Sequence, residues 1–88
     1  MNKIIFGSIA MDLKRVAIGY YRGSNKMAER FLGEALKRRS EVDVTTIKPY
    51  LQKLLLKIEA ISSETDVKKK AEDTLMYSTL FQNAALAS

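Results

Sequence analysis

The chain has 88 residues, of which 47% are hydrophobic and 28% are charged, and its formal net charge is +5 at neutral pH. A chain of this length forms one domain with a small core. The absence of Cys and His excludes disulfides, thiolate metal sites and catalysis by either side chain. One Pro and four Gly leave few turns, which favours a single helical domain over residues 1–88.

The positive charge is concentrated in the first 39 residues. Nine of the fifteen Lys and Arg lie there against three acids, a balance of +6, whereas six Lys face seven acids in residues 40–88, a balance of −1. Such an asymmetric distribution of charge along the chain indicates an anionic partner or a partner chain.

The first apolar run, residues 4–11, is too short to span a membrane. It loosely resembles a signal peptide, but it ends at Asp12-Leu13-Lys14-Arg15 without a small-x-small cleavage site, so we expect a helical segment instead. Translation from Met11 is an alternative start that the sequence leaves open. The Lys-rich, Cys-free composition favours a cytoplasmic protein.

Helical periodicity runs through residues 4–39. Apolar or small residues recur at three- and four-residue steps, namely Leu13, Val16, Ala17, Tyr20, Ser24, Met27, Phe31 and Ala35. Gly23 followed by Ser24 and Asn25 is typical of a helix that stops and restarts, so we favour a break or kink there. The unshifted apolar phase leaves open an unbroken helix over residues 4–39, which would be roughly 54 Å long.

Two further helices are predicted. The first covers about 47–61, with Thr46 as its N-cap and Pro49 in its first turn, and the second covers about 66–86 after an acidic loop. The predicted fold is all-α, an antiparallel bundle of three to four helices whose first helical region is long and kinked near Gly23-Asn25.

Residues 4–21 are apolar nearly all round, and such a surface does not stay in water. Either the segment folds back to complete a four-helix bundle or it pairs with another copy. A homodimer is expected, because the core of a single chain is small. The residues predicted to make the self-contact are Ile5, Ile9, Leu13, Val16 and Tyr20.

The cations of the first helical region are the candidate ligand-binding residues. On a continuous helix Arg15, Arg22, Lys26, Arg30 and Lys37 would share one side, and phosphates are natural partners for such a stripe. With the cations that end this region, the predicted nucleic-acid-binding residues are Arg15, Arg22, Lys26, Arg30, Lys37, Arg38 and Arg39. The alternative is a solvated face with local Glu29–Arg30 and Glu34–Arg38 pairs, the last cations complementing the helix dipole.

An enzymatic function is disfavoured, because the motifs that usually carry catalysis are missing from the sequence. The sequence contains no phosphate-binding Gly-rich motif, no nucleophile motif and no calcium loop, so we expect no catalytic residues, metal, cofactor or small-molecule substrate. The hypothesis is a small basic interaction module that binds an acidic partner, with nucleic acid favoured over acidic protein. The alternative is a structural or assembly protein that self-associates and binds another protein, with no nucleic-acid role.

Overall fold

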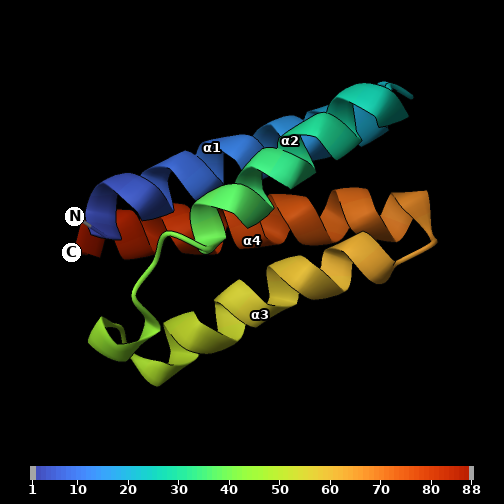
Figure 1. The fold of residues 1–88 in the computed structure, drawn as a ribbon. Helices are drawn as coiled ribbons and strands as arrows, with labels where there is room; N and C mark the ends of the chain where they lie inside the picture. The colour runs from blue at the N-terminus through green and yellow to red at the C-terminus, as the bar shows by residue number, and fades with distance from the viewer. Residues whose placement is uncertain (1, 88) are drawn as a thin grey trace.

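Four α-helices and one short 3-10 helix make up residues 2–87, the part of the chain that the computed structural model describes. They are α1 (Asn2–Tyr21), α2 (Asn25–Arg39), η1 (Val44–Thr46), α3 (Pro49–Ser63) and α4 (Val67–Ala87). Each α-helix runs antiparallel to the next one along the chain (Figure 1). The predicted all-α bundle is therefore confirmed.

The first helical region breaks at Arg22-Gly23-Ser24. Gly23 has φ of +74°, a left-handed conformation that Gly adopts without a steric penalty. The N–H of Gly23 donates to the carbonyl of Tyr20 at 3.1 Å, and the N–H of Ser24 donates to the carbonyl of Gly19 at 2.8 Å. This pair of bonds is the Schellman motif that ends a helix. The unbroken helix over residues 4–39 is thus wrong, and α2 folds back along α1 as a helical hairpin.

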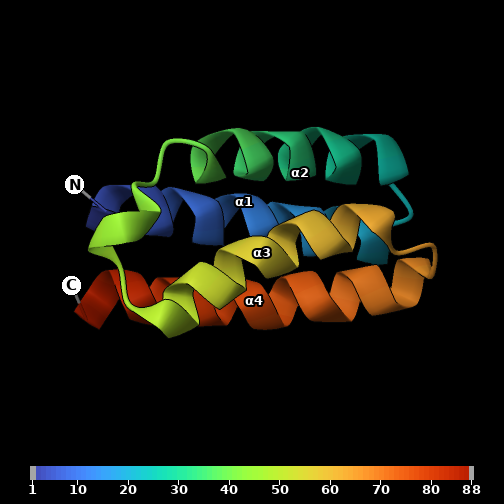
Figure 2. The same cartoon turned by 60° about the horizontal axis from the view of Figure 1, so that its bottom comes forward.

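α1 is the central helix of the bundle. It packs mainly against α2 and α4, which lie on either side of it in Figure 2, and α3 makes smaller contacts with the same two helices. Phe6 of α1 meets Phe81 of α4 with ring centroids 6.0 Å apart. The buried hydroxyl of Ser78 donates to the carbonyl of Ala10 at 2.7 Å, which ties α4 to α1. Neighbours on two sides explain why α1 is apolar around most of its circumference.

The residues predicted to mediate self-association lie inside this core. Ile9, Leu13 and Val16 have no exposed surface, and Tyr20 is buried with the Lys70 ammonium 5.5 Å from its ring centroid. Ile5 is half-buried and packs against the same cluster. The assignment of these five residues to a self-contact is therefore corrected, because α2 and α4 already cover them. Of the two alternatives for residues 4–21, the chain takes the folded-back one.

The start of α3 differs slightly from the prediction. Asp43 accepts hydrogen bonds from the hydroxyl of Thr45 at 2.6 Å and from its N–H at 3.0 Å, and these bonds lower the pKa of the Asp43 carboxyl. They hold the chain in η1, so Thr46 is not the N-cap of α3. Lys48 takes that position and Pro49 begins the helix.

α4 begins with a side-chain cap, as its acidic lead-in suggested. The Asp66 carboxylate accepts from the N–H of Lys68 at 3.0 Å and from that of Lys69 at 3.3 Å. Ahead of it, the N–H of Asp66 and the Lys69 ammonium lower the pKa of Glu64. These contacts satisfy backbone donors at the helix start that would otherwise have no partner within the helix.

Asp66→Ala is expected to lower the free energy of unfolding by about 1 kcal/mol, because it removes this cap. Urea unfolding followed by circular dichroism measures the change. Glu72→Ala, which removes an exposed acid six residues further along the chain and within α4, serves as the control and should change the free energy of unfolding by less than about 0.5 kcal/mol. Equal effects of the two variants would show that loss of a negative charge matters and that the cap does not.

Candidate functional site

The hairpin distributes the predicted cations over two helices. Arg15 lies on α1 and Arg22 in the turn, whereas the others lie on α2, which runs in the opposite direction. The single stripe predicted along one continuous helix is therefore corrected. What remains of it is a shorter row on α2, with Arg15 brought alongside from α1.

The row on α2 consists of Lys26, Arg30 and Lys37, here called the cationic ridge. These residues are exposed and follow steps of four and seven, which places them on one side of the helix. The opposite side, with Ala28, Leu32 and Ala35, is buried against the bundle. The ridge is roughly 16 Å long by the rise of an α-helix.

Phe31 joins the ridge to α1. The guanidinium carbon of Arg15 lies 5.4 Å from the centroid of this ring, and that of Arg30 lies 5.8 Å from it. Both distances are within the range of cation–π attraction. Two guanidinium groups from different helices are thereby held close to one half-buried aromatic side chain.

The last two predicted cations are bound within the protein. Arg39 donates from Nε to the carbonyl of Leu55 at 2.8 Å, and its Nη1 atom lies 3.1 Å from the Glu59 carboxylate, so it ties α2 to α3. Arg38 donates from Nε to Oδ2 of Asp12 at 2.9 Å and ties α2 to α1. Both guanidinium groups therefore hold helices together, a role that was predicted neither by the phosphate-binding hypothesis nor by the alternative of local pairs and helix-dipole complementation.

Asp12 is the residue whose importance the sequence analysis missed. Its side chain is only 5% exposed, and it pairs with Arg38 and, at 3.8 Å, with Arg15. A buried carboxylate needs such partners, because its desolvation is costly. The one available signal was its position next to Leu13 inside the apolar pattern. That pattern could not indicate which cation would meet it.

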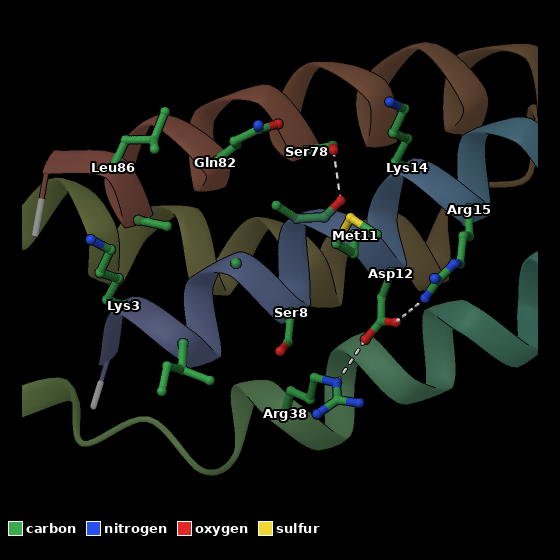
Figure 3. A pocket seen from close by; sticks show the side chains of 14 residues that line it. Lys3, Ser8, Met11, Asp12, Lys14, Arg15, Arg38, Ser78, Gln82 and Leu86 are labelled. Atoms are coloured by element: carbon green, nitrogen blue, oxygen red, sulfur yellow. Dashed lines mark hydrogen bonds and ion pairs between the residues drawn. The ribbon is translucent and has the colours of Figure 1, made fainter.

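A groove runs over the outer side of α1, between the end of α2 and α4, and is here called the α1 groove. It has a volume of about 660 Å³. Figure 3 shows Lys14 on its α4 side, Arg38 and Arg15 on its α2 side, and Lys3 near the start of α1. The other lining residues are Ile4, Gly7, Ser8, Ala10, Met11, Asp12, Ser78, Gln82, Ala85 and Leu86. None of the uncharged ones was singled out from the sequence as a binding residue.

Comparison of the chain with protein-family models, with curated proteins and with solved structures found no match. The class of protein is therefore defined by the fold alone: an all-α, four-helix bundle.

Two properties of residues 2–87 bear on the chemistry. No helix in this range is both long and apolar enough to cross a membrane. The same range contains no group of three or more carboxylates placed to hold a metal ion.

Proposed function

We propose that this protein is an interaction module that binds nucleic acid through the cationic ridge of α2. The observation that carries the proposal is the exposure of Lys26, Arg30 and Lys37 along one side of α2. Arg22, exposed in the adjoining turn, extends the positive surface. Arg15 adds a further guanidinium beside Arg30 through Phe31.

The spacing of the ridge suits a regular anionic polymer. Its length of roughly 16 Å covers about five phosphates of one duplex strand, at 3.4 Å per phosphate along the axis. Gly33 lies between Arg30 and Lys37, and a Cβ atom there would have nothing within 4 Å. The absence of a side chain at this point lets a phosphate backbone approach the helix closely. Because Lys and Arg side chains along a helix face pair with phosphates, we expect contacts to the backbone without sequence preference.

The triple variant Lys26→Ala, Arg30→Ala, Lys37→Ala is expected to weaken binding to a fluorescein-labelled DNA duplex. Each phosphate contact contributes about −0.9 to the slope of log affinity against log salt. Loss of three contacts should therefore flatten that slope by roughly 2–3 units. Fluorescence anisotropy in a KCl series, with a single-stranded oligonucleotide in parallel, measures both affinity and slope.

A matched control removes the same charge elsewhere. Lys53, Lys57 and Lys68 are exposed on α3 and α4, and their replacement by Ala should leave most of the affinity intact. Equal weakening by the two triple variants would mean that binding follows net charge, and the ridge would lose its role. Absence of binding by the unmodified protein at about 50 mM KCl would overturn the proposal itself.

Two earlier expectations stay predictions. A homodimer would now have to form through residues other than the buried core of α1, and a cytoplasmic location has composition alone in its favour. Nothing in the fold favours the alternative of a self-associating structural protein over the nucleic-acid proposal.

A further inference from the structure

We propose that the α1 groove is a second binding site, and that it takes an amphipathic α-helix from a partner protein whose apolar stripe is flanked by acidic residues. The inference goes beyond the proposed function, because none of the three ridge residues lines the groove, and Arg15 alone borders both surfaces. Its basis is the combination of an exposed apolar floor with cations along both sides (Figure 3).

The floor of the α1 groove is apolar and open to solvent. Ile4 is 75% exposed and Met11 is 53% exposed on α1, and Leu86 of α4 is 72% exposed. These side chains line one groove and are not scattered over the surface. Between them a Cβ atom on Gly7 would meet nothing within 4 Å, so the backbone of α1 is open to a close neighbour there. Small residues and a flexible Met are features of surfaces that accept a helix.

The charges identify the kind of helix. Lys14 lies on the α4 side of the groove and Arg15, whose side chain is 47% exposed, lies on the α2 side, with Lys3 at the start of α1 (Figure 3). Among the residues of 2–87 that line the groove, Asp12 is the single acid, and it is buried and paired with Arg38. A partner helix would therefore gain from acids on both flanks of its apolar stripe. From Lys3 to Arg15 the groove extends roughly 18 Å, which corresponds to about three helical turns.

The same charges disfavour a second copy as the occupant. Two copies joined through this groove would bring their Lys3, Lys14 and Arg15 side chains together, at a cost from like-charge repulsion. A lipid surface would meet a concave site, in which α2 and α4 stand at the sides of α1. A single helix fits between such walls, whereas a flat membrane is better matched by a convex apolar face.

Gly7→Leu tests the site by filling it. The probe is a fluorescein-labelled helical peptide of about 18 residues, with Leu at helical spacing and Glu on both sides of the Leu stripe. Fluorescence anisotropy should show binding that Gly7→Leu weakens by about tenfold or more. Gly33→Leu is the matched control: it makes the same change at another open position, on α2, and should leave peptide affinity unchanged. Both variants should retain the helical circular dichroism of the parent, because neither site is enclosed.

The charge requirement is tested separately. Lys3→Glu with Lys14→Glu should weaken the acidic peptide by about tenfold or more and improve binding of a peptide with Lys in place of Glu. Lys53→Glu with Lys57→Glu, on α3, changes the net charge equally and should have little effect. If a Glu-rich peptide without Leu binds as tightly as the amphipathic one, attraction is purely electrostatic and the proposal is overturned.

Evidence that a second copy of the chain or a lipid surface occupies the α1 groove would also overturn the proposal. Loss of a dimer in Gly7→Leu, measured by sedimentation, would assign the groove to a second copy. Weaker binding of Gly7→Leu to phosphatidylglycerol vesicles, with peptide affinity unchanged, would assign it to a lipid surface. Duplex DNA binding separates the two proposals, because Gly7→Leu should leave it intact. A failed peptide experiment therefore leaves the ridge standing, and a failed ridge experiment leaves the groove standing.

Discussion

Phe81→Ala is expected to lower the free energy of unfolding by about 3–5 kcal/mol, the range for deleting a fully buried aromatic side chain. Phe81 has no exposed surface and packs against Phe6, so the deletion leaves a cavity where α4 meets the start of α1. For a domain whose whole stability is of the order of 5–15 kcal/mol, this loss is a large fraction. Thermal and urea unfolding followed by circular dichroism measure it.

The matched change is Leu86→Ala, one and a half turns further along α4. Leu86 is 72% exposed, so its deletion should change stability by less than about 0.5 kcal/mol. A loss above 2 kcal/mol in Leu86→Ala would show that this residue is covered in solution and would argue against an open α1 groove. Stability of Phe81→Ala close to that of the parent would contradict the packing of α1 against α4.

Gly19→Leu is expected to disrupt the hairpin, with a loss of about 1–3 kcal/mol or more. A Cβ atom on Gly19 would lie 2.9 Å from the backbone N of Ala28 and 3.0 Å from its Cβ. Because the obstacle is the backbone of α2, no side-chain rotation relieves it. α1 and α2 would have to separate, and this would also disturb the pairing of Arg38 with Asp12.

Gly33→Leu is the control, because it separates the effect of close packing on stability from any general cost of placing Leu at a Gly within a helix. Gly33 also lies within a helix, but a Cβ there meets nothing within 4 Å. Gly33→Leu should therefore be neutral or stabilising by up to about 1 kcal/mol, because Gly is a poor helix former. Destabilisation of both variants to the same extent would rule out the close approach of Gly19 to Ala28 as the cause.

Local signals predicted the helices well, and the break at Gly23 shows why. The cost of consecutive poor helix formers at Gly23, Ser24 and Asn25 outweighed an apolar phase that passed through the turn unshifted. The unshifted spacing of apolar residues was misleading about which face of α2 is buried, because α2 has two adjacent stripes of apolar residues. The stripe that is buried contains Ala28 and Leu32, whereas the larger Phe31 is only half-buried. The close approach at Gly19 selects the small residue Ala28 for the contact with α1.

The candidate site was only partly predictable for a similar reason. Helical spacing correctly places Lys26, Arg30 and Lys37 on one face of α2, since that inference needs only the local helix. The same reasoning suggested a local Glu34–Arg38 pair, whereas Arg38 reaches Asp12, 26 positions away. The α1 groove depends on which helices flank α1, and periodicity carries no information about that.

The central position of α1 has a consequence for how the protein is made. Of the four helices, α1 is synthesised before the others and has the largest packed surface, and much of that surface packs against α4, which is synthesised after the other three. The α1–α2 hairpin can form before α4 is made, but the face of α1 that contacts Phe81 and Ser78 stays exposed to solvent until α4 has emerged from the ribosome. The bundle therefore cannot be completed before α4 has been made, and the nascent chain exposes apolar surface in the interval.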